Sequence, residues 1–199
     1  MTVIQKQAKL IILVVYLATM IPAYFYLAKW MIIGIPILTT FLTVYLLRHE
    51  YIHLTIKSFM DRPKMGTWIQ ISILFTIIVQ FIYHFFTSNT ATTSLPFQLM
   101  QQYPVMPIYM LANAPIVEEV IFRKIIFHEL DKKIHSWLAA VSSSILFGML
   151  HNSWVDFFMY FIIGLMFCYI YKKSQSIAPT MIGHAALNFI FIVNVSINN

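Results

Sequence analysis

Charged side chains are scarce in this chain, and acidic side chains most of all. Only 10% of the 199 residues are charged, with 13 lysines and arginines and seven aspartates and glutamates, while 60% are hydrophobic. This balance excludes an ordinary soluble domain and indicates a membrane protein. The chain also has one cysteine only, Cys168, so no disulfide can form within it.

The net charge of +6 does not indicate nucleic-acid binding, and we expect no nucleic-acid partner. The basic residues are dispersed between apolar runs and form no basic patch with interleaved aromatic residues. We expect instead that the lipid bilayer is the chain's surroundings, and that the lysines and arginines set its orientation.

The apolar runs predict an all-α fold, a polytopic membrane helix bundle with about seven transmembrane helices. A span needs ~20 residues, so no separate soluble domain fits beside them. The first run shows no clear small-residue cleavage site, and we interpret it as a retained span. We expect residues 95–104 to form an interfacial turn or short helix. The predicted spans are residues 10–28, 30–47, 67–86, 105–127, 136–151, 155–171 and 177–195.

The basic residues support this count. With the N-terminus in the cytoplasm and alternating spans, all of them except Lys29 fall on the cytoplasmic side, provided that Arg123 is assigned to the inner end of its span. The sequence therefore predicts an N-terminus inside, a C-terminus outside, and a multi-pass protein of a cell membrane. The abundance of lysine and isoleucine favours a bacterial plasma membrane.

Three ionised residues lie in the short stretch 118–123 of the apolar run at 105–127. They are Glu118, Glu119 and Arg123. A charge at the centre of a membrane helix costs roughly 2.5–3.5 kcal/mol, so these side chains are a functional hypothesis by default. Glu119 and Arg123 are four residues apart and share a helix face, which predicts an ion pair. Glu118 points elsewhere, and we interpret it as the free carboxylate that could act as a base.

Three further polar residues lie on two other apolar segments. His151 follows Phe147 by four residues, and Asn188 follows His184 by four, so each pair would share a helix face. At 1.5 Å per residue the predicted depths are ~14 Å for Glu118, ~10 Å for His184 and ~22 Å for His151.

These groups supply what amide hydrolysis requires, namely a base for water and donors for the oxyanion. Glu118 and His151 could share the first task, and His184 and Asn188 the second. Glu118, His151 and His184 could alternatively bind zinc with one open position. The other interpretations are packing histidines and an interhelical His–Asn hydrogen bond.

Taken in order, Glu118-Glu119-x-x-x-Arg123, Phe147-x-x-x-His151 and His184-x-x-x-Asn188 resemble the motifs of the CPBP family. This is the Abi family of CAAX-type and bacteriocin-processing intramembrane proteases. The resemblance covers residues 110–191, within the segment 105–195 that we interpret as the protease-like core of a single membrane domain, 1–199. Residues 1–104 carry no recognised motif.

The resemblance implies an all-helical membrane endopeptidase that cuts peptides near the cytoplasmic face. It implies that Glu118 and His151 activate water, that His184 and Asn188 stabilise the oxyanion, and that Glu119, Arg123 and Phe147 support the site. The family has been classed as metalloproteases, and a metal-free mechanism has also been argued. We favour the metal-free version slightly, because the chain lacks His-Glu-x-x-His.

The expected partner is a peptide or protein substrate in the membrane, with bacteriocin or pheromone maturation, or self-immunity, as its setting. One alternative is a non-catalytic scaffold or immunity protein that binds a peptide or a sensor kinase. A second alternative is a small transporter, although no internal repeat supports it. No feature of the sequence specifies an oligomeric state.

Overall fold

The computed structural model describes residues 7–16, 18, 29–46, 64–87, 95–151 and 154–197. All regular secondary structure within these ranges is helical, so the predicted all-α class is confirmed. The second half of the first predicted span, and the polar loop of residues 49–66 except for its last three residues, lie outside the described part.

One continuous helical rod contains the Glu-Glu-Arg motif. It runs from Met106 to Asp131 and alternates between α-helical and π-helical segments. The sequence predicted an uninterrupted α-helix at 105–127, whereas the structure contains π-helical segments within it. In order, the rod consists of α7 (Met106–Ile108), η2 (Tyr109–Asn113), α8 (Ala114–Glu119), η3 (Val120–Phe127) and α9 (His128–Asp131).

Pro115 explains the π-helical turn that precedes the glutamates. A proline inside an α-helix lacks its N–H and collides with the carbonyl of residue i−4. The wider η2 turn avoids this collision, and its geometry is seen in the N–H of Ala114, which bonds to the carbonyl of Tyr109 five residues earlier. Single π-helical turns of this kind occur frequently at functional sites.

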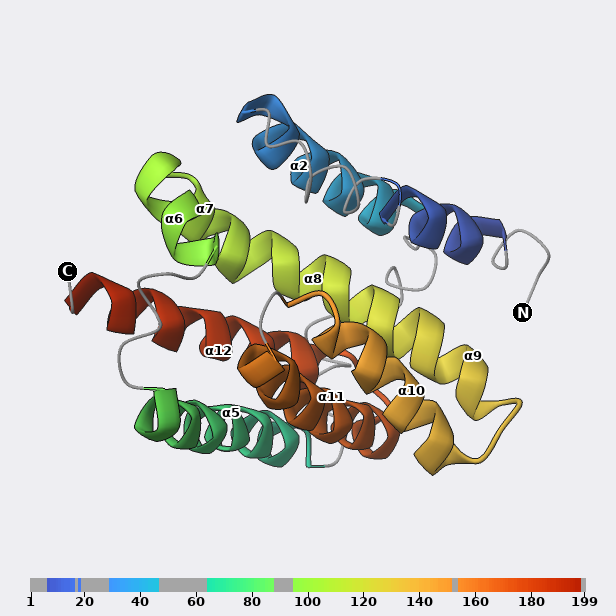
Figure 1. The fold of residues 1–199 in the computed structure, drawn as a ribbon. Coiled ribbons are helices and arrows are strands. Elements are labelled where there is room, and N and C mark those ends of the chain that lie inside the picture. Colours follow the sequence, from blue (N-terminus) through green and yellow to red (C-terminus); the bar gives the residue numbers. More distant parts are fainter. Residues whose placement is uncertain are drawn as a thin grey trace.

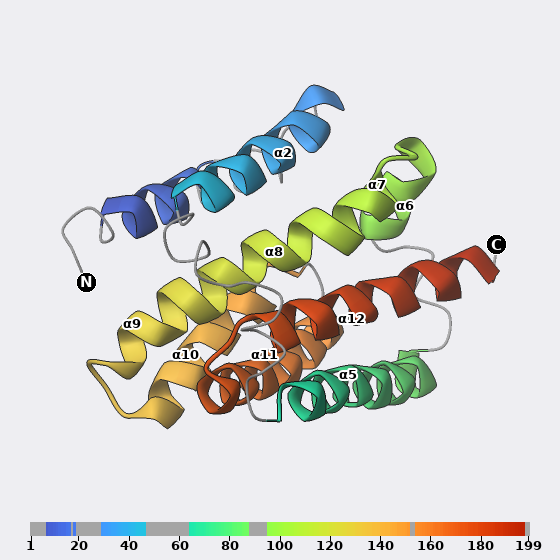
Figure 2. The same ribbon diagram turned by 180° about the vertical axis from the view of Figure 1, so that it is seen from behind.

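The remaining helices surround the rod (Figure 1). The N-terminal helix Gln7–Tyr16 and α2 lie along one side of it, and α10 and α12 pack on the other side, followed by α11 and α5. The view from behind shows the same order (Figure 2). The bounds are α2 Lys29–Leu46, α5 Met65–Thr87, α6 Leu95–Gln102, α10 Ser136–Gly148, α11 Trp154–Ser174 and α12 Ala178–Ile197.

Three of the described helices are long and apolar enough to cross a membrane. They are α5, α12 and residues Asp156–Ser174 of α11. Shorter apolar helices are formed by Gln7–Tyr16, Ile37–Leu46 and Ser136–Gly148. The count of seven spans and the sides on which the termini lie stay predictions, whereas the predicted short helix at 95–104 is confirmed by α6.

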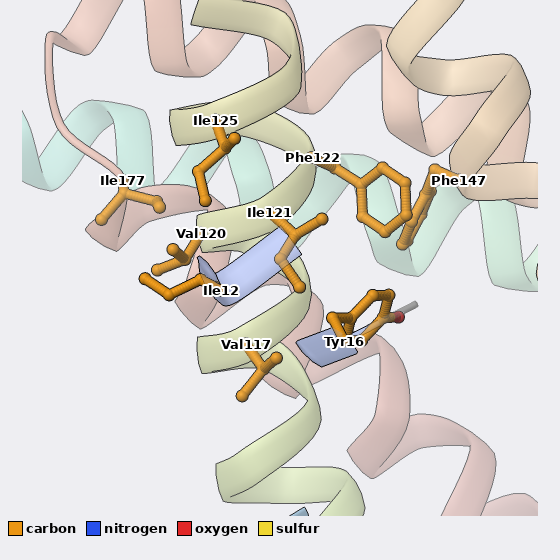
Figure 3. Packing of buried hydrophobic residues seen from close by; sticks show 9 residues of the cluster. All are labelled: Ile12, Tyr16, Val117, Val120, Ile121, Phe122, Ile125, Phe147 and Ile177. Atoms are coloured by element: carbon orange, nitrogen blue, oxygen red, sulfur yellow. The ribbon is translucent and has the colours of Figure 1, made fainter. Parts of the chain in front are cut away.

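The largest buried apolar cluster joins the N-terminal helix to the rod (Figure 3). Ile12 and Tyr16 meet the face of the rod formed by Val117, Val120 and Ile121, and the Tyr16 ring meets the Phe122 ring edge to face at 6.4 Å. A segment that carries no recognised motif therefore covers the helix that carries the glutamates.

An ion pair fixes the other end of the same contact. Lys9 is buried, and its Nζ donates to Oε1 of Glu129 on α9 at 2.9 Å. The sequence placed Lys9 among the dispersed cytoplasmic basic residues, and the structure gives it a specific acidic partner.

Candidate active site

Glu119 and Arg123 are both fully buried on the rod. Arg123 Nε lies 3.1 Å from Glu119 Oε2, which is an ion-pair distance, although the alignment does not make a hydrogen bond. The guanidinium also lies over the rings of Phe147, at 4.4 Å, and Phe167, at 5.2 Å. A cation over an aromatic face is attracted by the ring quadrupole, so the charge of Arg123 is balanced by one carboxylate and two rings.

His184 on α12 lies between the two glutamates. Its Nδ1 is 3.0 Å from Glu119 Oε1, and its Nε2 is 3.8 Å from Glu118 Oε2. Because the Glu119 carboxylate paired with Arg123 can only accept, the Nδ1–H of His184 donates to it. That assignment leaves Nε2 as the nitrogen that faces Glu118.

The two adjacent carboxylates differ in their access to the surroundings. The side chain of Glu119 is 0% exposed, whereas that of Glu118 is 17% exposed. Glu119 therefore orients His184, and Glu118 remains as the carboxylate that a bound molecule could reach. The sequence predicted that Glu119 would face Arg123, but it gave no indication of the bond to His184.

Asn188 is bound to the π-helical part of the rod. Its Nδ2 donates to the carbonyl of Met110 at 2.7 Å, and both residues are buried. In a π-helical turn the N–H of residue 115 would bond to this carbonyl, but residue 115 is proline. Asn188 replaces the missing donor. Its amide nitrogen has two hydrogens, so a second N–H remains for another acceptor.

Phe147 on α10 connects the three motifs. Its ring is fully buried and has centroid distances of 5.8 Å to His184, 5.6 Å to His151 and 5.1 Å to Phe122. Figure 3 shows the ring of Phe147, from α10, beside the ring of Phe122 on the rod.

His151 differs from its prediction, because it does not belong to helix α10. The helix ends at Gly148, and the chain then tightens into turns, with the N–H of Leu150 bonded to Phe147 and that of His151 to Gly148. Gly148 allows α11 to approach this end of α10 closely, because a Cβ there would lie 2.9 Å from the carbonyl oxygen of Phe157 on α11. In this turn His151 Nδ1 lies 3.2 Å from the Phe147 carbonyl oxygen, and the predicted depth of ~22 Å, which assumed an uninterrupted helix, stays a prediction.

The proposed zinc ligands are only partly brought together. Glu118 and His184 approach each other, but no hydrogen bond or ion pair joins either to His151 within the described residues. Across the same part of the chain, no group of three His, Cys, Asp or Glu side chains has the spacing of a metal site. This arrangement does not complete the ligand set Glu118, His151 and His184.

Three tyrosines near Glu118 were not identified from the sequence. The Glu118 carboxylate lies within electrostatic range of the hydroxyls of Tyr16, Tyr109 and Tyr160. They come from the N-terminal helix, from η2 and from α11, and no spacing in the sequence relates them. Aromatic residues in apolar runs are typical of membrane interfaces, so the sequence does not distinguish these tyrosines from ordinary interfacial ones.

The structure places a buried carboxylate–histidine centre in an all-helical bundle, and the comparisons with known proteins point to membrane peptidases. Residues 100–190 match the family described as Type II CAAX prenyl endopeptidase Rce1-like. This segment is similar to the Rce1-like CAAX protease family, which confirms the resemblance indicated by the three motifs.

Two curated relatives are bacterial. YdiL of Bacillus subtilis (strain 168), named for an inferred membrane peptidase activity, is 31% identical over 105 residues, which cover 53% of this chain and 43% of YdiL. The membrane-embedded CAAX protease MroQ of Staphylococcus aureus (strain USA300) is 27% identical over 101 residues, which cover 48% of this chain and 41% of MroQ.

The matched segment thus spans less than half the length of either relative. No solved structure matches the chain significantly. The relatives and the three apolar helices confirm the predicted multi-pass membrane protein, and the bacterial source of both relatives favours the predicted bacterial plasma membrane.

Proposed function

We propose that this protein is an intramembrane endopeptidase, in which Glu118 activates the attacking water. The observation that carries the proposal is the difference between the two glutamates: Glu119 is sealed in the core and orients His184, while Glu118 is partly exposed beside His184 Nε2. A carboxylate that is accessible and flanked by an oriented imidazole is what a general base requires.

The reaction follows from these groups. Glu118 accepts a proton from water as the water oxygen forms a bond to the scissile carbonyl carbon, and the carbonyl oxygen becomes an oxyanion. The proposed donors to that oxyanion are the second N–H of Asn188 and the Nε2–H of His184. The latter requires the doubly protonated imidazole, because the Nδ1–H is already donated to Glu119. The proton then passes to the amide nitrogen, the C–N bond breaks, and a new carboxylate and a new amine are released.

His151 is proposed to share the activation of water with Glu118. Its Nδ1–H is directed at the carbonyl of Phe147, since a carbonyl can only accept, so Nε2 carries the lone pair. A water molecule between Glu118 and His151 would join two groups that do not touch directly.

The substrate is proposed to be a small peptide or protein cut near the cytoplasmic face, in bacteriocin or pheromone maturation or in self-immunity. The names of the relatives support peptidase chemistry, and MroQ is itself named a CAAX protease.

The test compares peptides in membranes and medium of cells that carry wild type, Glu118→Gln or His184→Ala, by mass spectrometry. We expect at least one peptide to be longer in both variants than in wild type. Glu129→Gln is the matched control, because it makes the same change on the same rod outside the site. Unchanged peptides in both site variants, with all proteins at normal levels, would favour the non-catalytic scaffold instead.

Metal dependence is tested on the purified protein with a chelator and with added zinc. The metal-free mechanism predicts that cleavage survives the chelator. Loss of cleavage that zinc restores would assign the reaction to a metalloprotease.

A further inference from the structure

The ring of His151 has two aromatic neighbours. The ring of Phe147 lies roughly perpendicular to it, with centroids 5.6 Å apart, and His151 Nδ1 meets the Phe147 carbonyl. The ring of Tyr160 on α11 is stacked on the imidazole, with centroids 3.3 Å apart and planes 15° from parallel. Tyr160 also touches Phe147, with ring centroids at 5.7 Å, so the three rings form one group.

The backbone alone does not fix this imidazole. His151 lies beyond the last residue of α10 and is half-buried, so its side chain lacks the neighbours that a helix interior would provide. A side chain in such a position keeps rotamer freedom unless something packs on its ring. The flat face of Tyr160 supplies that contact.

The face of α11 that carries Tyr160 is hydrogen-bonded to a neighbouring helix. Asp156 precedes Tyr160 by four residues on α11, and it accepts a hydrogen bond from the hydroxyl of Tyr83 on α5. The Asp156 carboxylate also lies within electrostatic range of His151 and Tyr160. Tyr83 thus connects α5, which carries no motif, to the face of α11 that holds His151.

We propose that Tyr160 is a positioning residue for His151: its ring fixes the imidazole with Nδ1 at the Phe147 carbonyl and Nε2 available to the site. The part of this inference that concerns hydrolysis depends on the proposed function. The part that concerns the orientation of the ring does not.

The first test measures how accessible the His151 imidazole is to a reagent, and it does not depend on enzyme activity. Purified protein in detergent is treated with diethylpyrocarbonate, which modifies imidazole nitrogens, and the labelling rate of each histidine is read by mass spectrometry. Tyr160→Met keeps the bulk but removes the flat ring, and it should accelerate labelling of His151 several-fold. Tyr160→Phe keeps the ring and should leave the rate unchanged.

The chain supplies the controls for this experiment. Labelling of the exposed His84 shows that the reagent is active. Labelling of the buried His184 would show that the protein has unfolded. Phe158→Leu removes an exposed aromatic ring from the same helix and should change nothing. If His184 also becomes labelled in the Tyr160→Met protein, the experiment is repeated with Tyr160→Leu. Labelling of His151 at the wild-type rate in a folded variant that lacks the ring would overturn the proposal.

The second test concerns hydrolysis of the peptides that distinguish wild type from Glu118→Gln. Tyr160→Met should lower the cleavage rate roughly 10-fold with little change in KM, because a misplaced group loses rate more than binding. In a His151→Ala background the same change should have no further effect. Equal losses in both backgrounds would contradict positioning through His151, whereas absence of cleavage by wild type would refute the proposed function and leave the labelling result valid.

Discussion

At the scale of single residues, Glu119 has two partners and one of them was predictable. Arg123 is four residues away on the same helix, so local geometry predicts the pair. His184 is 65 positions away, and the bond between them depends on how α12 packs against the rod. The sequence therefore identified the residues of the candidate site but not the hydrogen bond that orients His184.

Replacing Glu119 by Gln should destabilise the protein strongly. Arg123 would keep its charge in the core without a counter-ion, and breaking a buried pair in this way costs roughly 3–5 kcal/mol. Unfolding by heat or denaturant in detergent measures the loss.

Two companion variants make that result specific. The double variant Glu119→Gln, Arg123→Met should regain most of the stability, since neither charge is then left alone. Glu118→Gln should lose far less than Glu119→Gln, because Glu118 is partly exposed and lies 3.8 Å from its imidazole neighbour. Equal losses at the two glutamates would contradict the assignment of Glu119 as the structural carboxylate.

A second residue-scale prediction concerns Asn188 and Pro115. Removing the side chain with Asn188→Ala leaves the buried Met110 carbonyl without its donor, at a cost of ~1–3 kcal/mol. Pro115→Ala restores a backbone N–H near that carbonyl, so the cost of Asn188→Ala should be smaller in this background.

The two substitutions are therefore expected to be coupled in a double-mutant cycle. Unfolding free energies of wild type, both single variants and the double variant give the coupling, which for residues in one hydrogen-bond network amounts to roughly 0.5–3 kcal/mol. Strict additivity would show that Asn188 does not substitute for the proline N–H.

At the scale of elements, the sequence located most of the helices but not their partners. The predicted spans at 30–47, 67–86, 155–171 and 177–195 agree with α2, α5, α11 and α12 to within three residues at each end. The π-helical turns of the rod escaped prediction because hydrophobic periodicity assumes one pitch, and only Pro115 marked the irregularity.

The contact between α5 and α12 depends on a small residue beside the site. A Cβ on Gly183 would lie 2.0 Å from Oγ and 2.9 Å from Cβ of Ser72, so alanine there must push the two helices apart. Gly183→Ala should cost ~1–3 kcal/mol and should displace the adjacent His184, lowering cleavage as well.

Ser72→Gly removes the colliding atoms and should rescue Gly183→Ala in both stability and cleavage. The matched control is Gly66→Ala at the start of α5, where a new Cβ would meet nothing within 4 Å. Thermal unfolding of the four proteins checks the expectation, and a tolerated Gly183→Ala would contradict the packing.

Ion pairs join the N-terminal helix and α11 to the end of the rod at α9, and they predict a pH dependence. Partial burial alone would raise the pKa of Glu129, but hydrogen bonds from Lys9 and Lys132 lower it below its usual value. Partial burial acts likewise on Asp131, and hydrogen bonds from Ser136 and Lys172 lower its pKa. Lys172 connects α11 to the end of the rod through this carboxylate, at 2.9 Å.

A carboxyl whose pKa is depressed in the folded state binds protons less readily there than in the unfolded chain. Its stabilisation is present above the unfolded pKa and is lost as the pH falls through the folded pKa. The melting temperature of wild type should therefore fall more between neutral and strongly acidic pH than that of Glu129→Gln, Asp131→Asn. Parallel curves of melting temperature against pH for the two proteins would show that these ion pairs do not contribute to stability.

At the scale of the whole molecule, the parts without a motif support the parts that have one. Tyr16 and Lys9 hold the N-terminal helix along the rod, while α5 contributes Ser72 against α12 and Tyr83 against α11. These first helices carry no recognised motif, because packing partners have no fixed spacing in the sequence. Composition alone did predict the membrane class and the helical fold, since both depend on averages over the chain.

The central claim is that the centre around Glu118 hydrolyses peptide bonds, and incorporation of water oxygen tests it most directly. Purified protein is reconstituted in lipid vesicles and incubated in H₂¹⁸O with peptides extracted from membranes of cells that lack it. Mass spectrometry then reads the new C-termini. Our account predicts shortened peptides whose new carboxyl groups contain ¹⁸O, formed by wild type and Glu129→Gln but not by Glu118→Gln. Equal incorporation by Glu118→Gln would contradict the role of Glu118, and no incorporation by any of the three would contradict hydrolysis itself.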